Sequence, residues 1–313
     1  MNDSLYYALL AALSGVSFGQ IAITLRLGQS RDVRGEPIFA IATLAGTIFF
    51  AAQGGLATVT ELPLAALAWA VAAGLPQYAM LRILRAGLKL GPLSPLWCAV
   101  SLGFVPAVVA AHFAYGEHLL ALQYVGLAAA IVCVASGSLT QRSGPTAAAA
   151  EGGRVARVLF YGMLLVVLVL MNGVAFCGTK FVAKQLTPSG ESWLDRYGHA
   201  YYMVFYFVIF LGCATDMAIT QRGQTPWRRA LPLGCWCGAG SIGGVALWKA
   251  CAVHMSAAAL FTASSVVQIL TASLASVIFF AERRTFWWYV LVATGIAAVV
   301  LFNIQGFLGV GRP

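Results

Sequence analysis

The sequence contains few charged residues. Asp, Glu, Lys and Arg make up only 9% of its 313 residues, against roughly a quarter in a soluble globular domain. Hydrophobic residues make up 60%, and the mean hydropathy is +0.84. This balance excludes a water-soluble domain and predicts an all-α integral membrane protein. An outer-membrane β-barrel is excluded as well, because the apolar runs are continuous and do not alternate with polar residues.

Several chemical signatures are also missing. The sequence has no GxxxxGK[ST] motif and no soluble stretch long enough for an ATP-binding domain, which excludes ATP-driven transport. No CxxC pair is present, and CWC at 235–237 lacks the spacing of a zinc or redox site, so we expect seven buried free thiols. His112 and His254 show no ligand spacing, and the acidic residues form no cluster near one membrane face. We therefore predict no metal, no cofactor and no enzymatic activity.

Apolar runs near the ~20 residues that cross a bilayer recur along the whole chain. They predict ten transmembrane helices. The runs cover residues 5–25, 36–57, 64–84, 93–114, 119–139, 157–179, 199–219, 230–250, 257–281 and 286–307.

The basic residues are spread over short loops and do not form a basic face, so the net charge of +9 does not indicate nucleic-acid binding. The five loops that follow the odd-numbered helices hold 14 of the 19 Lys and Arg residues, and the rest of the chain holds five. The positive-inside rule then puts these five loops in the cytoplasm and both termini outside.

A break in composition divides the chain into two halves. The segment TQRSGPTAAAAEGGR at 140–154 is rich in Gly, Ala, Ser and Pro, as flexible connectors are. We predict a first five-helix repeat at 1–139, a linker at 140–156 and a second five-helix repeat at 157–313.

Matching segments occur at corresponding places in the two halves. YGEHLLALQYVGLAAAIVCVASG at 115–137 and FAERRTFWWYVLVATGIAAVVLF at 280–302 share six residues, including Glu117 with Glu282. GVSFGQIAITLR at 15–26 likewise resembles GVAFCGTKFVAK at 173–184. Because each half has an odd number of spans, the second half would enter the membrane from the opposite face. The sequence thus predicts two inverted repeats, an arrangement common among secondary transporters.

Two five-helix halves, each with a glutamate before a final Gly/Ala-rich helix, resemble the drug/metabolite transporter (DMT) superfamily, and its EamA-like members in particular. The sharpest matches are GE at 116–117 and AE at 281–282. The resemblance implies a ten-helix carrier with a central cavity lined by both halves. It also implies cytoplasmic termini, whereas the basic loops indicate external ones. The sequence leaves both orientations open.

The ninth predicted helix carries a polar stripe. In LFTASSVVQILTASLASV at 260–277, Ser264, Gln268 and Thr271 fall on one helical face. Such side chains either hydrogen-bond to a neighbouring helix or line a watered cavity, and the sequence favours neither.

The other candidate substrate-binding residues are polar or aromatic side chains inside or at the ends of the predicted spans. Each has an alternative role, since tryptophans also anchor helices at the membrane interface and lysines at helix ends also reach toward water. These residues are Gln77, Tyr78, Trp97, Asn172, Lys180, Trp248 and Lys249.

These patterns predict a secondary active transporter of a small polar metabolite, such as an amino acid, a sugar or a related organic compound. It would work by alternating access in the cytoplasmic (inner) membrane, with the lipid bilayer and a small-molecule substrate as its partners. One alternative is efflux of amphipathic drugs or organic cations. Another is a non-transport membrane protein, such as a lipid-processing enzyme or a sensor subunit. The substrate, the direction, the coupling ion and the choice between monomer and homodimer are left open.

Overall fold

The computed structural model describes residues 3–90, 92–115, 121–139, 151–220, 226–252, 257–281 and 284–302. Within these ranges the regular secondary structure is helical, apart from an isolated antiparallel bridge between Leu186 and Ser192. The helices are α1 (Asp3–Ser30), α2 (Gly35–Phe50), η1 (Ala51–Gly55), α3 (Leu56–Thr58), η2 (Val59–Glu61), α4 (Leu64–Leu90), α5 (Leu93–Ser101), α6 (Phe104–Tyr115), α7 (Ala121–Leu139), α8 (Glu151–Lys184), α9 (Trp193–Thr220), α10 (Trp227–Ala252), α11 (Ala257–Ile278) and α12 (Phe286–Phe302).

Six helical segments are long and apolar enough to cross a membrane. They are Leu9–Ser30, Gly35–Glu61, Leu64–Leu90, Val158–Lys184, Trp193–Thr220 and Trp227–Cys251. Four shorter apolar helices accompany them, and every apolar run found in the sequence contains helix. Lipid offers the backbone no hydrogen-bond partners, so an apolar segment that crosses it must satisfy its own N–H and C=O groups by forming a helix. The protein is a multi-pass membrane protein.

Several boundaries differ from the prediction. Helices α1 and α4 run past their predicted ends at 25 and 84, to Ser30 and Leu90, and the run at 36–57 is divided into α2, η1 and α3. The run at 93–114 is divided into α5 and α6 at Leu102 and Gly103. Pro106 has no N–H for the Leu102 carbonyl, which accepts the Val105 N–H at 2.9 Å instead. Helix α8 begins at Glu151, inside the segment predicted as a linker. Residues 140–150, Glu117 and Glu282 lie outside the described part of the chain.

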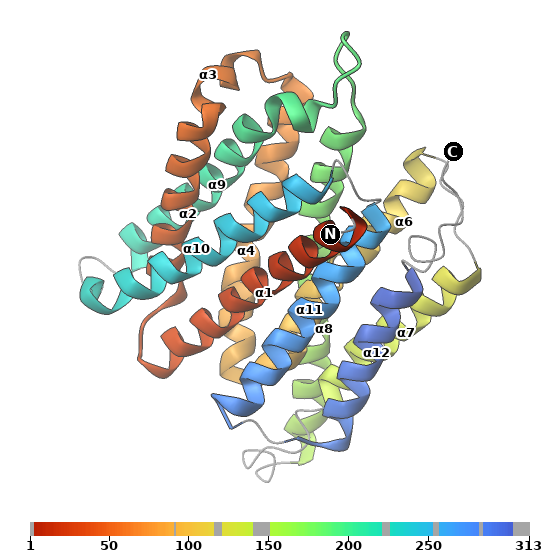
Figure 1. The fold of residues 1–313 in the computed structure, drawn as a ribbon. Coiled ribbons are helices and arrows are strands. Elements are labelled where there is room, and N and C mark those ends of the chain that lie inside the picture. Colours follow the sequence, from red (N-terminus) through yellow and green to blue (C-terminus); the bar gives the residue numbers. More distant parts are fainter. Residues whose placement is uncertain are drawn as a thin grey trace.

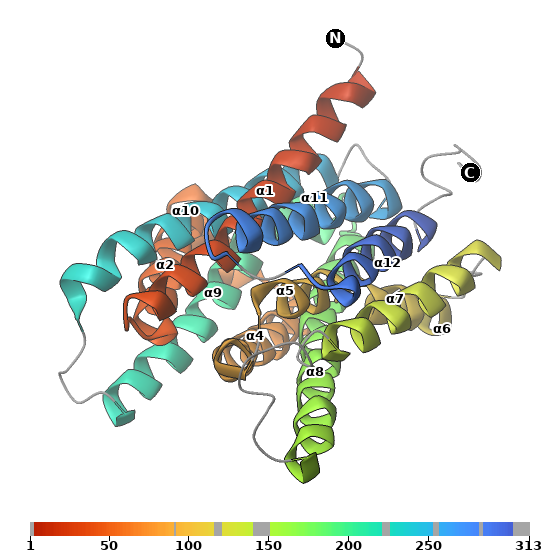
Figure 2. The same ribbon diagram turned by 90° about the horizontal axis from the view of Figure 1, so that it is seen from below.

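Figure 1 shows how helices from distant parts of the sequence pack together. Helix α1 packs on α10 and α11, α2 packs on α9 and α10, and α4 packs on α8 and α9. Helices α7 and α12 pair along their length at one edge of the molecule. Seen from below, α5 lies in the middle, where it contacts both α11 and α8 (Figure 2). This packing encloses a space surrounded by α1, α2, α4, α5 and α8 to α11.

Candidate functional site

A cavity of about 180 Å³ lies between these eight helices. Each of them contributes at least one side chain to its wall. The lining residues are Phe18, Ile21, Phe39, Thr43, Gln77, Met80, Leu84, Trp97, Val100, Asn172, Ala175, Phe176, Thr179, Tyr201, Tyr202, Phe205, Tyr206, Ile209, Ser241, Val245, Trp248, Ser264, Ser265 and Gln268. Ligand sites in proteins are concave and mostly apolar, with a few placed polar groups, and this lining has that character.

One wall of the cavity is built around an amide pair. Gln77 Nε2 of α4 donates to Asn172 Oδ1 of α8 at 2.7 Å. Asn172 Nδ2 in turn donates to the Val100 carbonyl at 2.7 Å, close to the break between α5 and α6. The side chain of Asn172 therefore joins three helices. The Gln77 Oε1 atom has no hydrogen bond among the described residues.

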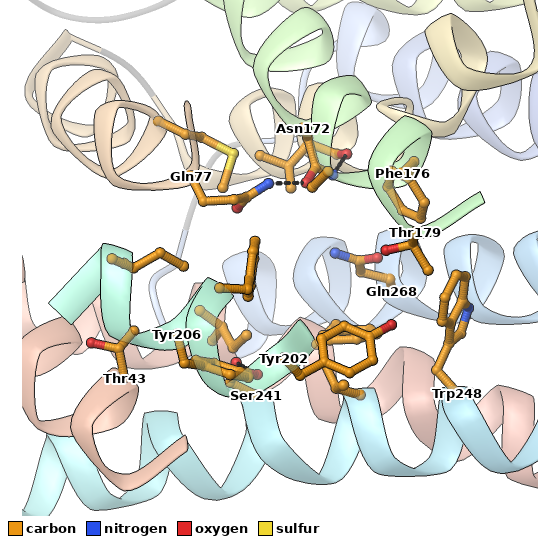
Figure 3. A pocket seen from close by; sticks show the side chains of 18 of the residues that line it. Thr43, Gln77, Asn172, Phe176, Thr179, Tyr202, Tyr206, Ser241, Trp248 and Gln268 are labelled. Atoms are coloured by element: carbon orange, nitrogen blue, oxygen red, sulfur yellow. Dashed lines mark hydrogen bonds between the residues drawn. The ribbon is translucent and has the colours of Figure 1, made fainter. Parts of the chain in front are cut away.

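Helix α11 carries the second polar wall, with Gln268 and Ser264. Gln268 is 8% exposed, and its amide points into the space between the walls (Figure 3). Within the described part of the chain, Gln268 makes no side-chain hydrogen bond. Ser264 also approaches Ser14 of α1, with 3.5 Å between the two hydroxyl oxygens. Gln268 thus lines the cavity, whereas Ser264 both lines it and contacts a helix.

Thr271, the third residue of the polar stripe, packs against α1 instead. A Cβ placed at Gly19 would lie 2.7 Å from the Cβ and from the Cγ2 of Thr271, so the two helices touch closely there. The stripe is split between a cavity and a helix contact.

Aromatic side chains form most of the remaining wall. Nine of them line the cavity, namely Phe18, Phe39, Trp97, Phe176, Tyr201, Tyr202, Phe205, Tyr206 and Trp248. Several contact one another, since Tyr201 meets Tyr202 edge to face at 5.2 Å between ring centroids, and Phe205 meets Tyr206 in the same way at 5.4 Å. The Tyr206 hydroxyl lies 2.7 Å from the Ser241 hydroxyl. The sequence prediction missed seven of the nine, although the run YYMVFYF at 201–207 signals an aromatic helix face.

The two tryptophans among the candidate residues both line the cavity. Trp97 is 3% exposed, and its Nε1 has no hydrogen-bond partner among the described residues. Trp248 meets Phe176 edge to face, with ring centroids 6.2 Å apart. Neither residue is placed as an interfacial anchor on the outside of the protein.

Three candidate residues lie outside the cavity lining. Tyr78 packs against α9, where a Cβ at Gly212 would meet its ring at 2.6 Å. Lys249 Nζ lies 3.0 Å from His199 Nε2. Lys180 directly follows the lining residue Thr179 on α8 but is not part of the wall. A role for these residues in substrate binding stays a prediction without support from the geometry.

No charged side chain lines the cavity, within the residues that the structure describes. The same residues contain no group of three or more His, Cys, Asp or Glu side chains that would hold a metal ion. All seven cysteines are free, as predicted, and five of them are buried. Cys177 is partly buried and Cys235 is exposed, so the expectation of complete burial was wrong for these two. His254 lies outside the described residues.

Comparison with known proteins identifies a fold but no family. No protein-family model and no curated protein matches the chain. Seventeen chains of solved structures do match. One of them, titled only "Crystal structure of protein", has a TM-score of 0.63 at 14% sequence identity, over 96% of this chain and 99% of that one. At this identity the likeness shows that the fold is shared over nearly the whole chain.

Proposed function

We propose that the protein is a secondary carrier that moves a small polar metabolite across the cytoplasmic membrane by alternating access. The observation that carries this proposal is the cavity between the helices before and after the connector, four from each side. Six of the nine candidate residues line it, namely Gln77, Trp97, Asn172, Trp248, Ser264 and Gln268. A carrier requires a site of this kind, which its two halves can open to one face and then to the other.

The packing of the helices supports inverted repeats. If the halves are exchanged, α1 replaces α8, α2 replaces α9, α4 replaces α10, α11 replaces α5 with α6, and α7 replaces α12. The α1–α10 contact then becomes α8–α4, α1–α11 becomes α8–α6, and α2–α10 becomes α9–α4. All of these pairs are packed, and so are the self-related pairs α2–α9, α7–α12 and α5–α11. A twofold axis would produce this correspondence.

The matching segments of α1 and α8 also pack alike. A Cβ at Gly15 would collide with the Ser264 carbonyl oxygen of α11. A Cβ at Gly173, its counterpart, would lie 2.8 Å from the Cβ of Pro106 on α6. Three residues after each glycine, Phe18 and Phe176 line the cavity. Matching residues of α1 and α8 thus make matching contacts. This favours an origin of the two halves by duplication and the DMT-like architecture.

The proposal is tested by counterflow. The purified protein is reconstituted into liposomes that are loaded with an unlabelled metabolite, and a trace of the labelled compound is added outside. A carrier accumulates the labelled compound inside the liposomes transiently. After it releases a labelled molecule inside, its site returns to the outer face with an unlabelled molecule bound, so little label is carried back out. A lipid-processing enzyme or a sensor subunit gives no counterflow for any compound of an amino-acid, sugar and nucleobase panel, and that result would reject the proposal.

A second candidate function is efflux of amphipathic drugs or organic cations. It is favoured by the nine aromatic side chains of the wall, since aromatic faces attract cations. It is disfavoured by the lack of a lining carboxylate among the described residues. Counterflow of quaternary ammonium compounds with none of the polar metabolites would support efflux.

A further inference from the structure

The charged side chains near the cavity contact other side chains and do not line it. Arg85 Nη1 donates to Glu36, and Arg82 Nε lies 3.6 Å from Asp216 Oδ2. Lys249 lies against His199. None of these six residues is part of the lining. A ligand with a net charge would therefore give up its hydration shell without gaining a counter-charge, which is strongly unfavourable. The electrostatics of the cavity suit a neutral occupant.

The hydrogen-bonding groups that remain available are amides. Gln268 offers the cavity both an N–H donor and a C=O acceptor, because its side chain has no partner among the described residues. Gln77 keeps a free Oε1 acceptor beside the Nε2 that holds Asn172. An amide binds best to a group that presents an acceptor next to a donor, and a buried amide left unpaired is unfavourable. An occupant with such an edge would satisfy the Gln268 side chain.

The aromatic wall and the cavity size define the rest of the occupant. Aromatic side chains bind flat rings by stacking or by edge-to-face contact, and Tyr202, Phe176 and Trp248 stand around the space that Gln268 enters (Figure 3). The cavity has a volume of about 180 Å³, and one ring with a small substituent fits this space.

We infer that the cavity binds a flat, uncharged molecule with one ring and a hydrogen-bond donor beside an acceptor, such as a heterocyclic carboxamide or lactam. Gln268 pairs with this edge, and the aromatic wall holds the ring. The inference rests on the proposed carrier function in treating the occupant as the transported substrate, but the binding itself is measured without transport.

Four probes of nearly equal shape test this substrate class. Nicotinamide is neutral and has the donor–acceptor edge, 3-acetylpyridine lacks the donor, nicotinate is an anion, and 1-methylnicotinamide is a cation. Affinities are measured by calorimetry on the full chain in lipid nanodiscs at pH 7. We expect nicotinamide to bind at least tenfold more tightly than either ion, a difference of about 1.4 kcal/mol, and several-fold more tightly than 3-acetylpyridine.

The variant Gln268→Leu removes the pairing group with little change in volume. In this variant nicotinamide and 3-acetylpyridine should bind equally. The matched control is Gln20→Leu, which makes the same substitution on α1. Gln20 Nε2 donates to the Trp236 carbonyl at 2.6 Å, and the residue does not line the cavity. The control should keep the wild-type preference.

Two results would overturn the inferred substrate class. One is an affinity for nicotinate or 1-methylnicotinamide equal to or above that for nicotinamide. The other is failure of both nicotinamide and uracil, a second neutral ring with this edge, to bind at millimolar concentration. Neither result affects the carrier proposal, which counterflow of a charged metabolite would still support. Conversely, tight nicotinamide binding without counterflow of any compound would retain the site and reject the carrier.

Discussion

The central cavity and the end of the protein where α2 begins and α4 ends use polar groups in different ways. The cavity is lined by neutral amides, hydroxyls and aromatic rings. The other region, which we call the charged end, consists of Glu36, Arg82, Arg85 and Asp216 with a second cavity of about 270 Å³ beside Arg85. Its two carboxylates are buried, at 3% exposure for Glu36 and 6% for Asp216.

Helix α4 belongs to both regions. Gln77, Met80 and Leu84 face the central cavity, whereas Arg82 and Arg85 fasten the same helix to α9 and α2. Charges are expensive in a membrane protein unless they are paired, and in this region the pairs join α4 to α9 and to α2. The difference indicates that the charged end holds α4 in place and that the neutral cavity binds the ligand. Four substitutions test this division.

The largest effect is expected at Arg85. The substitution Arg85→Met leaves the buried Glu36 carboxylate without its ion-pair partner, and its Oε2 already has no hydrogen bond among the described residues. We expect the free energy of unfolding to fall by about 3 kcal/mol, measured by denaturant titration in detergent micelles. The double variant Glu36→Gln/Arg85→Met should recover at least half of this loss. Equal stability of the single variant and the wild type would show that the pair does not fasten α4.

A smaller effect is expected at the cavity wall. Asn172→Leu takes the acceptor from Gln77 and an amide donor from the Val100 carbonyl. Loss of these bonds should lower the free energy of unfolding by about 2 kcal/mol, by the same titration. In the Gln77→Leu background the further loss should be smaller, because the two amides act together. Strictly additive losses would mean that the amide pair is not a unit.

Arg82→Met should have a still weaker effect, of about 1 kcal/mol. The Arg82 side chain is 59% exposed and lies 3.6 Å from Asp216, whereas the Arg85 side chain is 34% exposed. Its effect should fall as the salt concentration rises, because water and ions screen exposed charges. Stability measured at low and high salt checks this, and a loss that equals that of Arg85→Met would remove the distinction between the two pairs.

Hydropathy was sufficient to predict the helices, because lipid forces apolar segments into helices. It did not predict the break at Leu102 and Gly103, since a proline within a membrane helix is compatible with a continuous helix whose neighbours satisfy the freed carbonyl. That carbonyl accepts an N–H three residues ahead, and Asn172 of α8 lies against the break, where it donates to the Val100 carbonyl.

The candidate site was predictable in part where polarity was the signal. Gln77, Asn172, Ser264 and Gln268 were predicted, and all four line the cavity. The hydroxyl residues Thr43, Thr179, Ser241 and Ser265 line it as well and were not predicted. The aromatic run at 201–207 did not locate the site in the same way, because a tyrosine or phenylalanine in a membrane helix faces lipid as readily as a cavity. Lys249 was predicted to bind substrate because of its charge, but it does not line the cavity. Its neighbour His199 is 50 residues away in the sequence, and only the fold brings the two together.

The division between the two regions is tested most directly by Gln268→Leu, the substitution with the smallest expected effect on stability. Gln268 makes no side-chain hydrogen bond among the described residues, so the free energy of unfolding without ligand should change by less than about 1 kcal/mol. Counterflow at a low concentration of nicotinamide should nevertheless fall several-fold, in step with the weaker binding, whereas Arg82→Met should leave it unchanged. If Gln268→Leu keeps counterflow while Arg82→Met loses it, the ligand site lies at the charged end, and the assignment of ligand binding to the neutral cavity is contradicted.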